Sequence, residues 1–246
     1  MSSGSGQAAQ TRQRILVCAA QVFDRLGYDG TSLSQLVAAA ALTKGAFYFH
    51  FRSKADIAAA IVHQQYDSWP PLIAAVQEKE DSAMRRMLLT TFVVARAFQQ
   101  DVVVRAGVRL SAERDSVPVP LPTPYVGWIS QIGAYLEQAR DEGDLRPEVD
   151  SAATAYLIVA SFFGMQHVSW RLADRADLPD RLGDFWRLTL PALCTDSAGI
   201  ASLLTLVEAE ARLQHQSSTP SDSRDSRDSR DSRDSRDSGK VNSSSR

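Results

Sequence analysis

Apolar residues recur at helical spacing along most of this chain, and no convincing alternating pattern indicates a strand. The first stripe ends just before Gly27, where a helix C-cap is expected; it consists of Ile15, Leu16, Ala19, Val22, Phe23 and Leu26. The periodicity predicts an all-α protein whose first long helix ends near residue 26.

Two short helices are predicted to follow the first stripe. Ser32 and Gln35 form a capping box that opens one of them, and Thr43 can cap the next, from Lys44 to about Phe49. A longer helix followed by two short helices and a tight turn indicates helix-turn-helix geometry, with the second short helix in the major groove. Helical spacing alone does not separate this interpretation from an ordinary helical hairpin with an aromatic core contact.

The second short helix, TKGAFYFHF, combines small, polar and aromatic residues. Gly45 costs helix stability, about 1 kcal/mol relative to alanine, which is understandable if another surface must approach closely. We expect the aromatic residues to anchor this helix inward, namely Phe47, Phe49 and Phe51. Donors on or beside its exposed side are Lys44, Tyr48 and His50.

The rest of the chain predicts a larger helical body. Ser53 and Asp56 open a longer helix towards Trp69, which the pair Pro70-Pro71 is expected to break or kink. Four to six longer helices are predicted to follow, at about 81–100, 101–113, 124–141, 150–173, 179–193 and 197–214. Residues 117–124, VPVPLPTP, should form an extended connector, with Thr123 capping the next helix and Pro124 at its first position.

Composition divides the chain into four parts. Residues 1–10 should be a flexible N-terminus, 11–57 the three-helix helix-turn-helix domain, and 58–215 a ligand-binding and dimerisation domain. Residues 216–246 repeat Asp-Ser-Arg from Asp222 to Arg236 without an apolar anchor. Such a segment cannot bury a core and should be a disordered, solvated tail.

Charge is distributed unevenly although the net charge is only −2. Residues 1–65 carry six basic and three acidic side chains, a net of +3, which leaves −5 for the remainder. This asymmetry is typical of a protein that meets phosphate at one end, although a solvated face would look similar.

The sequence contains no membrane-spanning or secretory segment, and its two cysteines fit a reducing compartment. No apolar run reaches the roughly 18 residues of a membrane span, and the N-terminus lacks the apolar region of a secretory signal. Cys18 and Cys194 lie within apolar helical patterns. They fit a reducing cytoplasm better than a disulfide framework.

We found no indication of an enzyme. The four histidines show no metal-ligand spacing with cysteine or carboxylate. Phosphate-loop, nucleophile-elbow and C-x-x-C motifs are absent from the sequence. We therefore expect no metal site, no cofactor and no catalytic residue.

Residues 11–57 resemble the DNA-binding domain of TetR-type repressors through TRQRIL, LGYDGTSLSQL and LTKGAFYFHFRSKADI. The stretches VVVRAGVRLSAER, PYVGW and FFGMQHVS further resemble the γ-butyrolactone-type autoregulator receptors of actinomycetes, and most of all the receptors for furan-type signals. The resemblance implies a helical homodimer that represses genes at palindromic operators, including antibiotic-cluster genes, until a lactone, butenolide or furan releases it. A receptor-like repressor that has lost this signal and senses antibiotics or other small molecules is the alternative.

The resemblance also implies which residues meet DNA. Lys44 and Gly45 should face the major groove, and phosphate contacts are expected from Thr31, Ser32, Tyr48, His50 and Lys54. Pure capping is the alternative role for Thr31 and Ser32. Packing against the following helix is the alternative for His50.

The implied ligand site centres on Trp128, which in this subfamily closes over the ligand, although a core tryptophan is the alternative. One or two of the residues on segments that converge on the body's interior should orient the ligand; the candidates are Gln64, Gln65, Gln131, Ser161, Phe162 and Gln166. We expect the dimer to form through helices 150–173 and 179–193. Their apolar stripes include Phe162, Phe163, Trp170, Phe185, Trp186 and Leu190.

Overall fold

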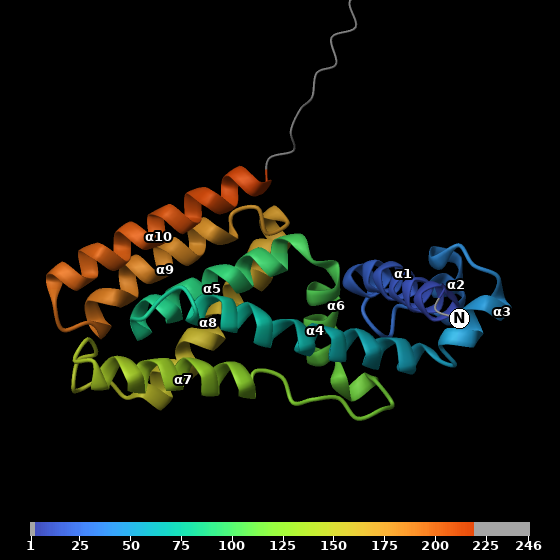
Figure 1. The fold of residues 1–246 in the computed structure, drawn as a ribbon, viewed down its shortest axis with the longest axis horizontal. Helices are drawn as coiled ribbons and strands as arrows, with labels where there is room; N and C mark the ends of the chain where they lie inside the picture. The colour runs from blue at the N-terminus through green and yellow to red at the C-terminus, as the bar shows by residue number, and fades with distance from the viewer. Residues whose placement is uncertain (1–2, 219–246) are drawn as a thin grey trace, which may run out of the picture.

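A computed structural model describes the backbone of residues 3–218 and the side chains of residues 6–214 (Figure 1). These residues form ten α-helices and one 3-10 turn, as the all-α prediction requires. The expected tail, 216–246, lies almost entirely outside the described residues. The helices are α1 Ser3–Leu26, α2 Leu33–Ala40, α3 Lys44–His50, α4 Lys54–Gln77, α5 Ala83–Gln100, α6 Val102–Ala112, α7 Val126–Asp141, α8 Ser151–Ala173, α9 Leu178–Leu193 and α10 Ser197–Ser218, with the 3-10 turn at Arg114–Ser116.

The molecule is elongated, with a small head at one end and a larger body at the other (Figure 1). Helices α1, α2 and α3 form the head, and α5 and α7–α10 form most of the body. Helix α4 runs from the head into the body, and α6 lies against both α1 and α4. Helices α4 and α6 therefore join the head to the body, and a shift of either helix in the body would also shift the head.

The caps predicted for the head are present. Helix α1 ends at Leu26, and Gly27 follows with φ 73°, the left-handed conformation that glycine adopts without strain. Ser32 and Gln35 form the complete capping box of α2. The Thr43 hydroxyl accepts a hydrogen bond from the Ala46 backbone N–H at the start of α3. Short-range hydrogen bonds thus determine where the helix-turn-helix begins and turns.

Pro70-Pro71 was predicted to break or kink the preceding helix. The predicted break is wrong, because α4 continues through both prolines to Gln77. The two prolines lack the N–H groups that would bond the carbonyls of Tyr66 and Asp67. Packing compensates for this loss, since Trp69 is buried in the body core and Leu72 and Ile73 pack against that core on the other side of the prolines. Tertiary contacts here outweigh a local helix-breaking signal.

The start of α7 also differs from the prediction. Tyr125, and not Thr123, is the residue before the first helical turn, and it has φ 69° with no side-chain cap. The Thr123 hydroxyl instead accepts a hydrogen bond from Arg114. Helix α1, in turn, begins at Ser3, within the range expected to be flexible; alanine and glutamine at positions 7–10 have high helix propensity.

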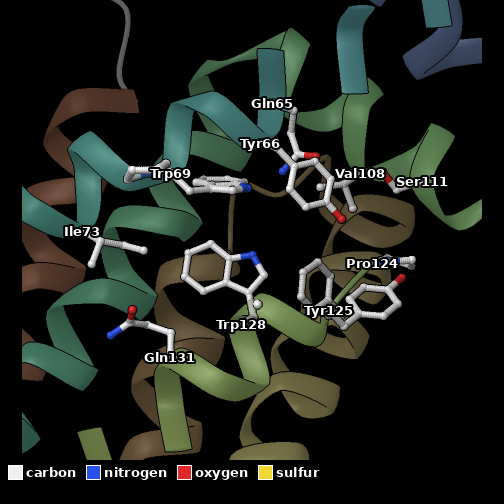
Figure 2. Close-up of a pocket in the computed structure, with 13 residues that line it drawn as sticks. Gln65, Tyr66, Trp69, Ile73, Val108, Ser111, Pro124, Tyr125, Trp128 and Gln131 are labelled. Carbon is white, nitrogen blue, oxygen red and sulfur yellow. The ribbon is translucent and has the colours of Figure 1, made fainter. Parts of the chain in front are cut away.

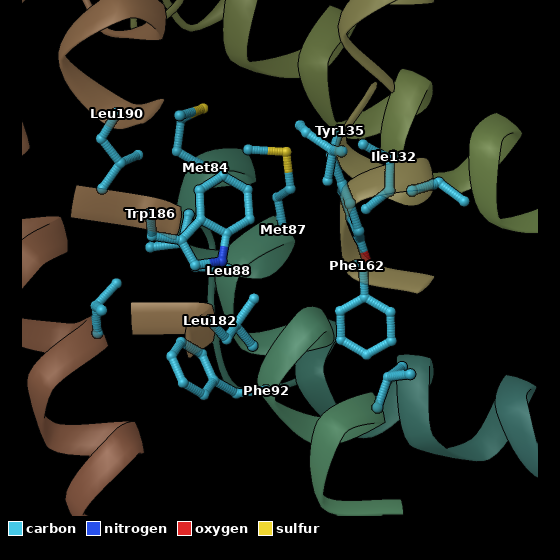
Figure 3. Packing of buried hydrophobic residues seen from close by; sticks show 14 of the residues in the cluster. Met84, Met87, Leu88, Phe92, Ile132, Tyr135, Phe162, Leu182, Trp186 and Leu190 are labelled. Carbon is cyan, nitrogen blue, oxygen red and sulfur yellow. The ribbon is translucent and has the colours of Figure 1, made fainter. Parts of the chain in front are cut away.

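Two apolar cores stabilise the molecule. The head core extends beyond residues 11–57, because Val103, Ala106 and Leu110 of α6 pack into it. The body core lies among α5, α7, α8, α9 and α10, with Trp186 fully buried beside Met84, Met87 and Phe92 of α5 (Figure 3). The Trp186 indole N–H donates to the Thr91 hydroxyl at 3.0 Å.

Several apolar residues expected at the dimer interface pack inside their own chain. Phe162, Trp186 and Leu190 are buried in the body core (Figure 3). Other side chains of α8 and α9 are apolar and exposed instead: Tyr156, Leu157, Val168, Leu172 and Leu188. Each helix has an inner and an outer face, and the largest aromatic residues occupy the inner one.

Trp186→Ala should lower the free energy of unfolding by about 3–5 kcal/mol, because it opens a cavity in the core and leaves the Thr91 hydroxyl without its donor. Urea denaturation at fixed protein concentration measures this change. The exposed control Thr205→Ala should stay within about 0.5 kcal/mol of the wild type. Equal stabilities for the two variants would contradict the central position assigned to Trp186.

Candidate DNA-binding surface and ligand cavity

Helix α3 is attached to the head by two of its expected aromatic anchors. Phe47 and Phe51 are buried, but the inward placement expected for Phe49 is wrong, since its side chain is 79% exposed. Two residues along a helix correspond to a rotation of about 200°, so Phe47 and Phe49 point in nearly opposite directions. The exposed face of α3 therefore contains an aromatic ring in addition to polar groups.

Lys44, Gly45 and Tyr48 all lie on exposed parts of α3. Lys44 and Tyr48 are four residues apart and so share one face. A Cβ added at Gly45 would meet nothing within 4 Å, so the fold itself does not demand glycine there. His50 is half-buried, and its ring packs edge-to-face on Phe49 at 5.1 Å. These positions suit the predicted groove contacts, with His50 at their margin.

The other residues predicted to contact phosphate, Thr31, Ser32 and Lys54, hold the loop before α2 in place. Thr31 is buried, and its hydroxyl donates to the Gly27 carbonyl at 2.6 Å. Lys54 Nζ donates to the carbonyls of Tyr28 and Thr31 at 2.8 and 2.9 Å, and lies 3.9 Å from the centre of the Tyr28 ring. Ser32 is exposed while it caps α2. The phosphate role thus stays a prediction that fits Ser32 better than Thr31 or Lys54.

A cavity of about 210 Å³ opens in the body between α4, α6, α7 and α8 (Figure 2). Trp128 on α7 points toward Trp69 on α4, and the two rings meet edge-to-face with centroids 5.2 Å apart. The complete lining is Gln65, Tyr66, Trp69, Pro70, Ile73, Val108, Ser111, Pro124, Tyr125, Gly127, Trp128, Gln131 and Phe163. Aromatic walls with a few polar groups are typical of small-molecule sites.

Polar groups in this wall are available to a ligand. Trp69 Nε1 is buried and has no hydrogen-bond partner among the described residues. The buried Ser111 hydroxyl forms no hydrogen bond of normal length there and interacts weakly with Tyr66. Burial raises the pKa of Tyr66 above its usual value, so its hydroxyl is protonated at neutral pH, and it donates to the Thr123 carbonyl at 3.3 Å. An unpaired buried donor is costly, and a ligand oxygen can satisfy it.

A smaller apolar cavity of about 30 Å³ continues past Trp128 and Phe163, which line both spaces. Its walls include Phe162, Ile158 and Val94. Polar groups thus lie at one end of the combined space and only apolar surface at the other. This arrangement suits an amphiphilic ligand with a polar ring and a hydrocarbon chain.

The structure brings together some of the predicted ligand residues and separates others. Trp128, Gln65 and Gln131 line the main cavity, and Phe162 lines the smaller one. Gln64 lies on the outer side of α4 beside Arg12, and Ser161 lines neither cavity. Gln166 is buried elsewhere and accepts from Arg175 Nε at 3.5 Å. Gln64, Ser161 and Gln166 therefore do not line either of these two cavities.

Most of the other residues that line the main cavity were not predicted from the sequence as ligand contacts. Gln65, Trp69 and Ile73 recur every four residues and so form one stripe on α4. This spacing predicts that Trp69 and Ile73 line the cavity if Gln65 does. Tyr125 lies within the PYVGW stretch, but no periodicity identifies it as lining, because it enters the cavity wall through a left-handed conformation that is uncommon for aromatic residues.

Helix α6 contacts both the cavity and the head. Val108 and Ser111 line the cavity, and a Cβ at Gly107 would meet the Gln65 side chain at 2.5 Å, so α4 and α6 are in close contact. On the head side, Arg105 pairs with Asp24 at 2.8 Å. A ligand that moves α6 therefore also moves the point where α1 is held.

The described residues thus combine a helix-turn-helix head with a larger body that contains an aromatic cavity, and α4 and α6 join the two. Residues 15–61 match the model for bacterial regulatory proteins of the tetR family, and residues 81–195 match the tetracyclin repressor-like C-terminal domain. The chain belongs to the TetR family of transcriptional regulators.

Individual relatives narrow the comparison. The A-factor receptor protein of Streptomyces griseus is 36% identical over 187 residues, which cover 76% of this chain and 65% of that protein. The match thus spans slightly less than two thirds of that relative's length. A solved γ-butyrolactone receptor, described as ArpA-like, is 33% identical with a TM-score of 0.74, covering 84% of this chain and 99% of that chain.

A second solved structure concerns the control of antibiotic production by bacterial hormones. It is 39% identical with a TM-score of 0.68, and the match covers 76% of this chain and 98% of that chain.

Within residues 3–218 no single helix is long and apolar enough to cross a membrane. The bent helix pair α5–α6 has the length and composition of a membrane span only when its two helices are taken together.

Proposed function

We propose that this protein is an autoregulator receptor: a homodimeric repressor that binds palindromic operators and is released by a small diffusible signal. The signal would be a γ-butyrolactone, butenolide or furan, and the target genes would include those of antibiotic biosynthesis. The similarity to the A-factor receptor and to a γ-butyrolactone receptor supports this role.

The observation that carries the proposal is the position of the cavity. It combines aromatic walls, unpaired polar groups and an apolar extension, and it lies against α6, which also packs into the head. Ligand binding can release DNA only if the ligand favours the conformation that does not fit the operator. A cavity that shares a helix with the head supplies this coupling without any catalytic step. We propose that the protein acts by binding alone, in the cytoplasm, where its operators are.

A mobility-shift assay with a promoter fragment tests this function. The full-length protein should retard the fragment at modest salt, and a synthetic γ-butyrolactone, butenolide or furan should release it in a concentration-dependent way. Release by an antibiotic but by none of these signals would support the alternative, a receptor-like repressor. Failure to bind any promoter fragment from an antibiotic cluster would contradict the proposal.

Lys44→Ala and Tyr48→Phe should each weaken operator binding several-fold without unfolding the protein, because both side chains are exposed and little packing is lost. A lysine–phosphate contact should also contribute about one unit to the slope of log affinity against log salt. Fluorescence anisotropy at several salt concentrations measures both quantities. Gln13→Ala, exposed on α1, is the control and should bind like the wild type. Unchanged affinity and slope in both α3 variants would show that α3 does not face the operator.

A further inference from the structure

A second cavity, which the proposed function does not use, lies where the head meets the body. It measures about 610 Å³, and its walls come from α1, α6 and α8 together with the residues after α8. Four arginines line it, Arg105, Arg109, Arg171 and Arg175, against only two carboxylates, Asp24 and Glu113. The lining therefore has a net charge of +2, in a chain whose total charge is slightly negative.

Both carboxylates already have partners. Asp24 pairs with Arg105 Nε at 2.8 Å, and Glu113 pairs with Arg109 Nε at 2.9 Å. Arg171 and Arg175 form no ion pair with any described residue. The excess positive charge of this basic cleft, defined by the four arginines, thus resides on these two guanidinium groups.

Arg175 is only 5% exposed, and among the described residues its guanidinium has one long hydrogen bond, from Nε to Gln166 at 3.5 Å. Burial lowers the pKa of Arg175 to about 10, although the charges of Asp24 and Asp174 partly oppose this, so the group is still protonated at neutral pH. A buried cation without a carboxylate partner is expensive. Its donors can form two parallel bonds with a carboxylate.

The backbone around Arg175 adds to this cost. Asp174, the C-cap of α8, has φ 47° in a common helix ending that aspartate tolerates, whereas the following Arg175 has φ 65°, which is uncommon for arginine. The Arg175 carbonyl accepts from Gln99 Nε2 at 2.8 Å, which holds the segment in place. Strain of this kind is concentrated at functional sites.

Trp170 forms an aromatic surface within the cleft. The guanidinium carbons of Arg175, Arg171 and Arg109 lie 5.1, 5.4 and 5.7 Å from the centre of its ring. Each contact is favourable as a cation–π interaction, but three like charges around one ring repel one another. An anion among them relieves that repulsion. Phe163, Tyr125 and Val108 complete the apolar part of the wall, and the same three residues also line the ligand cavity.

We propose that the basic cleft is a second binding site, which takes a small organic carboxylate with an aromatic or apolar skeleton. The carboxylate would bind Arg175 and Arg171, and the skeleton would lie against Trp170 and Phe163. This inference does not rest on the proposed signal, because the two cavities have different polar groups. The site adjoins the Asp24–Arg105 pair, so its occupant contacts the junction of head and body.

Isothermal titration of the full-length dimer with benzoate tests the proposal, with benzamide as the uncharged ligand of the same shape. Benzoate should bind at least about tenfold more tightly than benzamide. Arg175→Gln and Arg171→Gln should each weaken benzoate binding about fivefold or more and leave benzamide nearly unchanged. Arg171 is exposed, so its variant stays informative even if the buried substitution disturbs folding. Arg187→Gln, an exposed arginine on α9 that pairs with Asp184, is the control and should bind benzoate like the wild type.

Benzoate that binds no more tightly than benzamide would overturn the proposal. Binding that survives both cleft substitutions would overturn it too, because benzoate would then occupy another place, such as the ligand cavity. Neither result bears on operator binding or signal release, which the mobility-shift assay measures separately.

Discussion

Trp128→Ala is expected to bind operator DNA like the wild type but to require roughly 30–100-fold more signal for release. The head does not contain Trp128, whereas the cavity loses an aromatic wall that contacts Trp69 and lines both parts of the ligand space. Burial of a large aromatic side chain against a ligand contributes about 2–3 kcal/mol, and each 1.4 kcal/mol is a factor of ten in affinity. Titration of a synthetic signal into the protein–DNA complex measures the shift.

Ser130→Ala is the matched control, since Ser130 lies exposed on the same helix and outside the cavity. It should release DNA at the wild-type signal concentration. If Trp128→Ala also does so, Trp128 is a packing residue and the ligand binds elsewhere. Loss of operator binding in Trp128→Ala would instead indicate that the substitution disturbs the body as a whole.

The double substitution Leu172→Glu, Leu188→Glu should abolish the dimer and reduce operator affinity by at least about 100-fold. These leucines of α8 and α9 are 81% and 82% exposed, and large exposed apolar side chains on adjacent helices indicate a partner surface. A monomer reads one half-site only and loses the gain of two linked heads, about 10²–10⁴ in affinity. Light scattering at micromolar concentration and anisotropy with operator DNA measure the two effects.

Val126→Glu serves as the control because it also places a charge on an exposed apolar residue, but on α7. That variant should remain dimeric. A double variant that is still a dimer would place the interface outside α8 and α9. In the wild-type dimer, we expect half-sites one DNA turn apart, about 34–36 Å, or a multiple of this distance.

Local sequence determined the helix-turn-helix. The caps at Gly27, Ser32 and Thr43 depend on hydrogen bonds that span only three or four residues, so the residue types and their spacing are sufficient to predict them. The helical periodicity of the body is equally local. Its apolar stripes predicted the order of α5–α10, with boundaries within a few residues of those observed, whereas the end predicted for α4 near Trp69 was too early.

Only the tertiary structure decided which residues line the cavity. Gln64 and Gln65 are adjacent, yet a rotation of about 100° between them places Gln65 in the cavity and Gln64 on the outer side of α4. Pro70-Pro71 stays within α4 because Trp69, Leu72 and Ile73 around the prolines pack against the body core. Both outcomes depend on how α4 packs against helices that are distant in sequence.

The basic cleft depends on the same kind of contact. Asp24, Arg105 and Arg175 are far apart in the chain, and nothing in their local sequence indicates that they meet. Asp24 pairs directly with Arg105 and acts on Arg175 only at longer range, which becomes evident only when α1, α6 and the end of α8 are placed together. The sequence thus determined the helices and the DNA-binding motif, because these depend on near neighbours. Packing between distant helices decided where the cavities lie and which charges remain unpaired.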